Sequence, residues 1–135
     1  SYINESYLPS PIERLKVYKN LTNASSIDEI NNIAKDLKDR CGSLTTEVKS
    51  LIDDSKLLVM IRNTGIINIK SNANKTSILL SSSIRKKVFD KILTMLQISP
   101  NIYSINQENK FIIEMNENDT SVRRNAIMNL INEIT

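Results

Sequence analysis

The segments "IINIK" at residues 66–70 and "TSILL" at residues 76–80, joined by the polar turn "SNAN" at 71–74, decide the fold class. Two short runs rich in β-branched residues with turn formers between them are typical of a β-hairpin. The pattern returns further along, where "IYSIN" at 102–106 and "KFIIEM" at 110–115 flank "QEN". Because a hairpin pairs its strands antiparallel, the two patterns predict a small, mainly antiparallel sheet.

The segments outside these hairpins show the spacing of amphipathic helices. Ser10, Pro11 and Glu13 form a helix start with a capping box, and Ser26 with Glu29 forms a second one. Apolar residues then recur every three or four positions along five helices. The buried faces are expected to be Ile12, Leu15, Tyr18 and Leu21; Ile27, Ile30, Ile33, Leu37 and Cys41; Leu44, Val48, Leu51, Ser55, Leu58 and Arg62; Ile84, Val88, Phe89, Ile92 and Leu96; and Val122, Ala126, Ile127, Leu130, Ile131 and Ile134.

The order of these elements predicts an α+β fold. Three helices fill the N-terminal half, and two further helices alternate with the hairpins, so helices are expected to pack on one face of the sheet. A chain of 135 residues has the size of one ordinary domain. We therefore expect an extended lead over residues 1–9, connecting to an upstream domain, and a single domain over residues 10–135.

The composition argues against several classes of enzyme. The chain has no histidine, which removes the commonest general base and metal ligand. Its two glycines, Gly42 and Gly65, are too far apart for a phosphate-binding loop or a dinucleotide-binding turn. The single cysteine suits a reducing cytoplasm, and no apolar run is long enough to span a membrane. We expect a cytoplasmic chain that has no catalytic, metal-binding or cofactor-binding residues of its own.

The motif "DLKDRCG" at residues 36–42 is interpreted as the end of a helix. Gly42 stands where a left-handed cap residue is usual, and Lys38 and Arg40 occupy the last turn, where positive charge is favourable. A thiolate would be disfavoured at this end of a helix. Cys41, on the apolar side, is therefore expected to be a small buried hydrophobic residue.

The charged residues of the same motif are candidates for partner binding. Asp36 and Arg40 are spaced to form an ion pair one helical turn apart. Asp36 and Asp39 are like charges near the carbonyl end of a helix, where negative charge is unfavourable. A cation from a partner would offset that arrangement, although a solvated charged face is the commoner meaning of such a cluster.

Two basic runs offer an alternative function, that of an independent nucleic-acid-binding module. Lysine and arginine side chains can contact phosphates, but these runs lie near helix starts and no aromatic residue is interleaved with them. A solvated surface is therefore the favoured interpretation. The residues concerned are Arg85, Lys86, Lys87, Arg123 and Arg124.

Three segments in order resemble one protein family. "SYLPSPIERLKVYKNL" at residues 6–21 is similar to the opening of the C-terminal domain of bacterial transcription-repair coupling factor, the Mfd family. "DLKDRCGSL" at 36–44 resembles the acidic-Leu-x-Asp-Arg-aromatic-Gly signature of that domain, and "GIINIK" stands where its first strand begins. The chain departs from the pattern at Cys41, which replaces an aromatic residue, and at Thr45, which replaces a common proline and weakens the start signal of the third helix.

The resemblance implies a regulatory fragment of a larger enzyme. The parent would be an ATP-dependent DNA translocase that removes stalled RNA polymerase from damaged DNA and recruits UvrA for nucleotide excision repair. ATP and Mg²⁺ would bind its motor domains, and DNA would be contacted through its other domains. The C-terminal domain, expected to be monomeric, would pack on the N-terminal UvrB-like module and mask the UvrA-binding surface. Carried over by position, Asp36, Asp39 and Arg40 would make this contact, with the carboxylates facing arginines.

Overall fold

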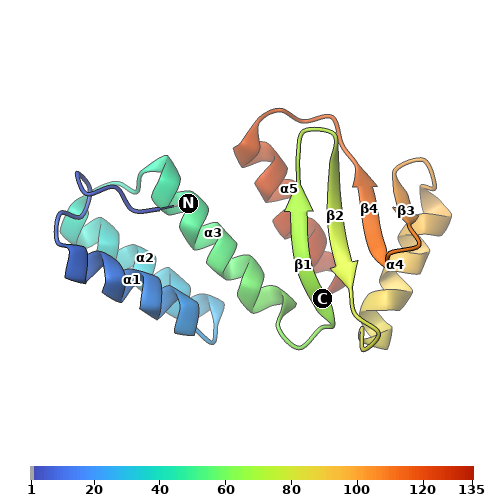
Figure 1. Ribbon diagram of the computed structural model, residues 1–135, viewed down its shortest axis with the longest axis horizontal. Helices are drawn as coiled ribbons and strands as arrows, with labels where there is room; N and C mark the ends of the chain where they lie inside the picture. Colours follow the sequence, from blue (N-terminus) through green and yellow to red (C-terminus); the bar gives the residue numbers. More distant parts are fainter. Residues whose placement is uncertain (1) are drawn as a thin grey trace. The chain divides into compact units, whose positions relative to one another are not determined.

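The computed structural model describes residues 2–135, which form five helices and four strands in the predicted order (Figure 1). The prediction of an α+β fold is confirmed. The chain divides into a first compact unit that ends at Val59 and a second that runs from Met60 to Thr135. The expectation of one domain over residues 10–135 stays a prediction. The elements are α1 Pro11–Asn23, α2 Ile27–Cys41, α3 Thr46–Ile61, β1 Ile66–Ser71, β2 Lys75–Leu80, α4 Lys86–Ile98, β3 Tyr103–Ile105, β4 Lys110–Glu114 and α5 Thr120–Ile134.

The first unit is built around one apolar core shared by three helices. Helices α1 and α2 lie side by side (Figure 1), and α3 adds its own buried residues to the same core. The stripe predicted for α2 is confirmed, since Ile30 and Leu37 are fully buried. The buried members of this core are Ile3, Leu8, Val17, Leu21, Ala24, Ile30, Leu37, Val48 and Ile52.

The buried face of α1 differs from the prediction. Ile12 and Leu15 are 65% and 67% exposed, whereas Val17 is 4% exposed and shares the core with Leu21. Two apolar stripes run along this helix at helical spacing, and tertiary packing buries only the one that contains Val17. In α3 the predicted core residue Leu58 is likewise 60% exposed.

Residues 2–9, expected to be an extended lead, are a folded part of the first unit. A turn closes where the backbone N–H groups of Tyr7 and Leu8 donate to the carbonyl of Asn4, at 3.0 and 3.1 Å. The N–H of Ile3 donates to the Tyr18 hydroxyl at 2.7 Å, and Ile3 and Leu8 are buried. Arg14 Nη1 also donates to the carbonyl oxygen of Leu8 at 2.7 Å. These contacts give structural roles to Tyr7, Leu8, Arg14 and Tyr18, which belong to the segment at residues 6–21 that resembles the family.

Side-chain caps define where α2 and α3 begin. Ser26 Oγ accepts a hydrogen bond from the Glu29 N–H at 3.2 Å, as the predicted capping box requires. The Glu29 carboxylate, however, accepts from the N–H and hydroxyl of Ser25, one residue earlier than expected, at 2.8 Å each. At α3, Thr45 Oγ1 accepts from the Val48 N–H at 3.3 Å. Threonine therefore supplies a side-chain cap at the position where the family pattern has proline.

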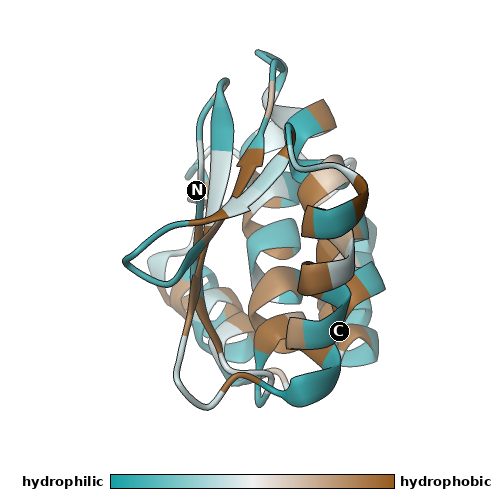
Figure 2. Cartoon of the chain, turned by 90° about the vertical axis from the view of Figure 1, so that its right-hand side faces the viewer, coloured by the Kyte–Doolittle hydropathy of each residue, from teal (hydrophilic) through white to brown (hydrophobic). Residues whose placement is uncertain are grey.

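The second unit is a four-stranded antiparallel sheet with two helices. The strand order is β1-β2-β4-β3, in which each predicted hairpin forms and β2 pairs with β4 between them. Viewed along the sheet, the strands lie on one side and helices α4 and α5 on the other (Figure 2). In β2 alternate residues are buried, whereas β4 buries three residues in succession. The core of this unit includes Ile78, Leu80, Phe111, Ile112, Ile113, Val88, Ile92, Ile127, Ile131 and Ile134.

Gly65 lies where two loops of the second unit meet backbone to backbone. Its φ is +91°, and a Cβ atom placed on it would collide with the backbone of Ile84. Its carbonyl accepts a hydrogen bond from the Ser81 N–H at 2.8 Å, and the Arg85 N–H donates to the Thr64 carbonyl at 2.9 Å. Only glycine fits this contact without displacing the neighbouring chain.

Candidate protein interface at the end of helix α2

Helix α2 ends at a glycine held by the N-terminal segment. The Gly42 N–H donates to the Lys38 carbonyl at 3.0 Å, and its φ and ψ are 87° and −166°. The prediction of a glycine cap with positive φ is confirmed, but the conformation belongs to a region that essentially only glycine occupies, not to the left-handed helix. The Tyr7 hydroxyl donates to the Gly42 carbonyl at 2.9 Å. Burial raises the pKa of Tyr7 above its usual value of 10.0, and the nearby Cys41 makes a smaller contribution in the same direction.

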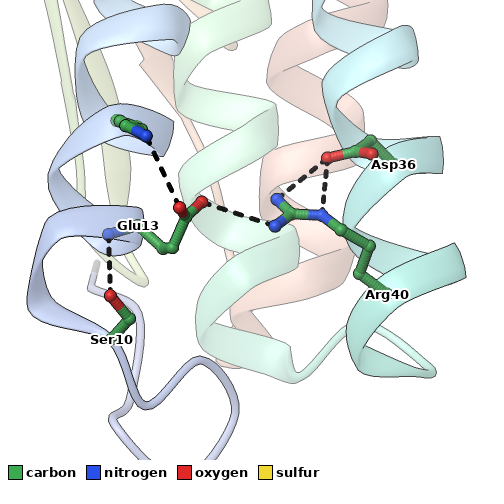
Figure 3. A network of polar contacts seen from close by, with 5 residues as sticks. Ser10, Glu13, Asp36 and Arg40 are labelled. Atoms are coloured by element: carbon green, nitrogen blue, oxygen red, sulfur yellow. Dashed lines mark hydrogen bonds and ion pairs between the residues drawn. The ribbon is translucent and has the colours of Figure 1, made fainter.

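Arg40 bridges two helices through two carboxylates (Figure 3). Its Nε and Nη2 atoms lie 3.0 and 2.9 Å from Asp36 Oδ2, one turn earlier on α2. Its Nη1 atom lies 3.4 Å from Oε2 of Glu13, which belongs to α1. The predicted pairing of Asp36 with Arg40 is confirmed, and the network also ties α1 to α2.

This network lies at the surface. The side chains of Asp36, Arg40 and Glu13 are 60%, 43% and 36% exposed. The charge of Asp36 and its hydrogen bond raise the pKa of Arg40 most, and Glu13 adds a smaller contribution, so the guanidinium stays charged. Solvent screens such pairs, and their contribution to stability is therefore small.

Asp39 lies on the neighbouring turn of α2 and is exposed. Among residues 2–135 it has no hydrogen-bond or ion-pair partner. We call Glu13, Asp36 and Asp39 the acidic cluster: three carboxylates accompany the cations of Arg40 and Lys16, so these five side chains have a formal net charge of −1. Carboxylates with free lone pairs are acceptors for planar guanidinium groups. Chemically, this surface can bind a cationic partner.

Glu13 is the member of the cluster that sequence reasoning missed. It was assigned to a capping box, in which its carboxylate would accept from the Ser10 N–H. In the structure Ser10 Oγ accepts from the Glu13 N–H at 3.3 Å, while the Glu13 carboxylate faces Arg40 and, at 3.5 Å, Lys16. No signal in the sequence connects Glu13 with Arg40, because the contact spans 27 residues of chain.

Cys41 lies partly buried against the core of the first unit. It contacts the core as the prediction of a small hydrophobic residue requires, although its burial is incomplete. Among residues 2–135 no group of three or more potential metal ligands gathers, and no helix is long and apolar enough to cross a membrane.

Three of the five residues in the two basic runs are engaged in contacts. Lys86 Nζ lies 2.6 Å from Asp90 Oδ2, and this hydrogen bond and charge raise the pKa of Lys86. Arg123 donates to the Glu117 carbonyl at 3.0 Å, and Arg124 is also engaged. Arg85 and Lys87 are exposed. The nucleic-acid contact stays a prediction.

Comparison with known proteins identifies the family. The model of the TRCF domain matches residues 1–90. The transcription-repair-coupling factor of Haemophilus influenzae is 25% identical over 130 residues, which cover 96% of this chain and 11% of that protein. The chain therefore spans about a tenth of that relative's length. A crystal structure of the C-terminal domain of transcription-repair coupling factor has the same fold, with a TM-score of 0.77 at 14% identity, covering 99% of this chain and 88% of the other. The resemblance predicted from the sequence is confirmed, and the chain belongs to the TRCF domain family.

Proposed function

We propose that this chain is a regulatory domain that binds the N-terminal UvrB-like module of its parent protein and masks the surface that module offers to UvrA. The parent would be an ATP-dependent DNA translocase that displaces stalled RNA polymerase, with ATP, Mg²⁺ and DNA bound by its other domains. In this proposal the chain acts by binding and not by catalysis. The observation that carries the proposal is the exposed acidic cluster at the end of α2.

The cluster is suited to a reversible contact. Asp39 has no partner within the described chain, and Asp36 keeps 60% of its side chain exposed while it binds Arg40. Both carboxylates can therefore accept hydrogen bonds from arginines without unfolding any element. On release they return to water, so the free domain does not carry a large exposed apolar patch at this position.

Arg40 has a different role from the two aspartates. It is held by Asp36 and Glu13, so it cannot donate freely to a partner without breaking contacts inside its own unit. We assign Arg40 to positioning: it restrains the carboxylates of Asp36 and Glu13 and links α1 to α2. Preorganised carboxylates lose less side-chain entropy on binding than mobile ones do.

The energetics allow a switch. Charge pairs that are desolvated at an interface contribute up to several kcal/mol, whereas exposed pairs contribute about 1 kcal/mol or less. Moving a two-state equilibrium almost completely requires a differential affinity of about 5.5 kcal/mol. A few desolvated arginine–carboxylate pairs, released when polymerase binds elsewhere on the parent, fall in this range.

The test measures binding between this chain and the separately produced UvrB-like module, which is titrated to high concentration because the tether of the parent protein, which raises the effective concentration, is absent. Asp39→Lys is the informative variant, since it removes no contact inside the unit. We expect it to weaken the association about tenfold or more, because a carboxylate that faces arginine becomes a repelling cation.

Asp28→Lys is the matched control. Asp28 is also an exposed aspartate of α2 with no partner among residues 2–135, but it lies in the first turn, about 16 Å along the helix from Asp39. The Asp28→Lys variant should therefore bind the UvrB-like module as tightly as the parent chain does. If the two variants weaken binding equally, or if Asp39→Lys has no effect on binding, the acidic cluster is not part of the interface.

A further inference from the structure

A basic groove runs between α2 and α3 in the first unit. Its volume is about 370 Å³, and its walls carry four lysines. These lysines have no ion-pair or hydrogen-bond partner in the described part of the chain. They are Lys35 and Lys38 from α2 and Lys49 and Lys56 from α3.

The groove is separate from the contact that ties α2 to α1. Arg40 reaches toward Glu13 of α1, whereas Lys35 and Lys38 share their groove with residues of α3. One helix therefore presents carboxylates beside α1 and ammonium groups beside α3. The acidic cluster accounts for none of the groove residues.

We infer that this groove binds an acidic segment of a partner protein, in which an apolar side chain is flanked by aspartates or glutamates. The apolar part of the lining, which we call the floor, favours such an occupant, since Leu44 and the buried Ile52 line the groove together with the lysines. An apolar side chain seated there would be removed from water, while flanking carboxylates would meet the ammonium groups at the rim.

The same walls are poorly suited to nucleic acid. No arginine and no aromatic residue lines the groove, so neither bidentate phosphate binding nor base stacking is available. Lysine point charges above an apolar floor match a peptide carboxylate better than a polynucleotide.

The experiment uses the 135-residue chain and a fluorescein-labelled synthetic peptide in which one leucine is flanked on both sides by glutamates. Fluorescence anisotropy is recorded at low and at physiological salt. We expect saturable binding that weakens with salt, and no binding of the same peptide with glutamine in place of each glutamate. Replacing the leucine by serine should also weaken binding, because the floor contact is lost.

A triple neutralisation tests the site itself. Lys38→Gln, Lys49→Gln and Lys56→Gln together should weaken peptide binding about tenfold, since several exposed charge pairs are removed at once. The control variant Lys19→Gln, Lys70→Gln and Lys75→Gln changes the net charge equally at exposed lysines outside the groove and should bind like the parent chain. Lys35 is left intact in both, because it lies one turn from Asp39.

Three results would overturn the inference. The first is the absence of saturable binding by the glutamate peptide, and the second is equal loss in the groove variant and the control. The third is that the chain binds single-stranded or duplex DNA tightly and does not bind the peptide. In that case the groove variant would lose DNA binding and the control variant would keep it. Circular dichroism of both variants checks that the fold is retained.

Discussion

Substituting alanine at the two glycines separates the cost of a backbone conformation from the cost of a collision. Gly42 and Gly65 both have positive φ, at 87° and 91°. A Cβ at Gly42 would meet no atom within 4 Å, whereas one at Gly65 would collide with the backbone of Ile84. Gly42→Ala therefore carries the conformational strain alone, and Gly65→Ala carries strain and collision together.

The magnitudes follow from these two situations. Holding alanine at a glycine conformation costs about 1–3 kcal/mol. Displacing a packed neighbour adds about 1–3 kcal/mol, and the neighbour here is main chain held by hydrogen bonds from Ser81 and Arg85. We expect Gly65→Ala to lower the free energy of unfolding by about 2 kcal/mol more than Gly42→Ala does.

Urea denaturation followed by far-ultraviolet circular dichroism measures both variants. Amide hydrogen exchange then locates the effect, which should appear in β1, β2 and α4 for Gly65→Ala and at the end of α2 for Gly42→Ala. If Gly65→Ala is no more destabilising than Gly42→Ala, the close approach between the two loops of the second unit does not exist in solution.

Two further predictions concern single hydrogen bonds of the first unit. Tyr7→Phe should lower the free energy of unfolding by about 1 kcal/mol at neutral pH, because the Gly42 carbonyl loses a donor. Since the pKa of Tyr7 is raised in the folded state, the unfolded chain releases this proton first, so the parent chain loses stability as the pH rises above 10.0. The difference in the free energy of unfolding between the parent chain and Tyr7→Phe, measured by urea denaturation, should therefore become smaller as the pH rises above 10.0. A difference that stays constant with pH would contradict the assigned hydrogen bond. Thr45→Ala should lower the free energy of unfolding by about 1 kcal/mol, because α3 loses its side-chain cap. The control is Thr22→Ala, since the Thr22 hydroxyl donates to a carbonyl within α1. If both variants lower the free energy of unfolding equally, Thr45 does not act as a cap.

Local signals in the sequence predicted most of the fold. Each hairpin was visible because β-branched runs flank polar turns, but no local pattern indicated that β2 would pair with β4 to join the hairpins. The face of α2 was predicted correctly because Ser26 and Gly42 mark its ends and only one apolar stripe lies between them. In α1 two stripes compete, and the choice between Ile12 and Val17 depends on contacts with residues 2–9 that no local pattern reveals.

The candidate site was predictable to the same extent. Asp36 and Arg40 share one helix, and their spacing alone predicts the ion pair. The contact of Glu13 with Arg40, and the placement of the α3 lysines in the groove, depend on how α1 and α3 pack against α2. This packing is tertiary information. Caps were predicted at the right residues, yet the side chains of Glu13 and Glu29 found other partners because water-exposed carboxylates have several acceptable donors.

The distribution of tyrosines makes the two units optically distinct. The chain has no tryptophan, and of its four tyrosines only Tyr103 belongs to the second unit. Its ring, partly buried on the edge strand β3, stacks on Phe111 with the centroids 5.7 Å apart. Replacing Tyr103 by phenylalanine would leave tyrosine emission in the first unit alone, and the difference from the parent chain would report on the second unit. Intrinsic fluorescence can therefore show whether the two units melt together or one at a time, without any attached dye.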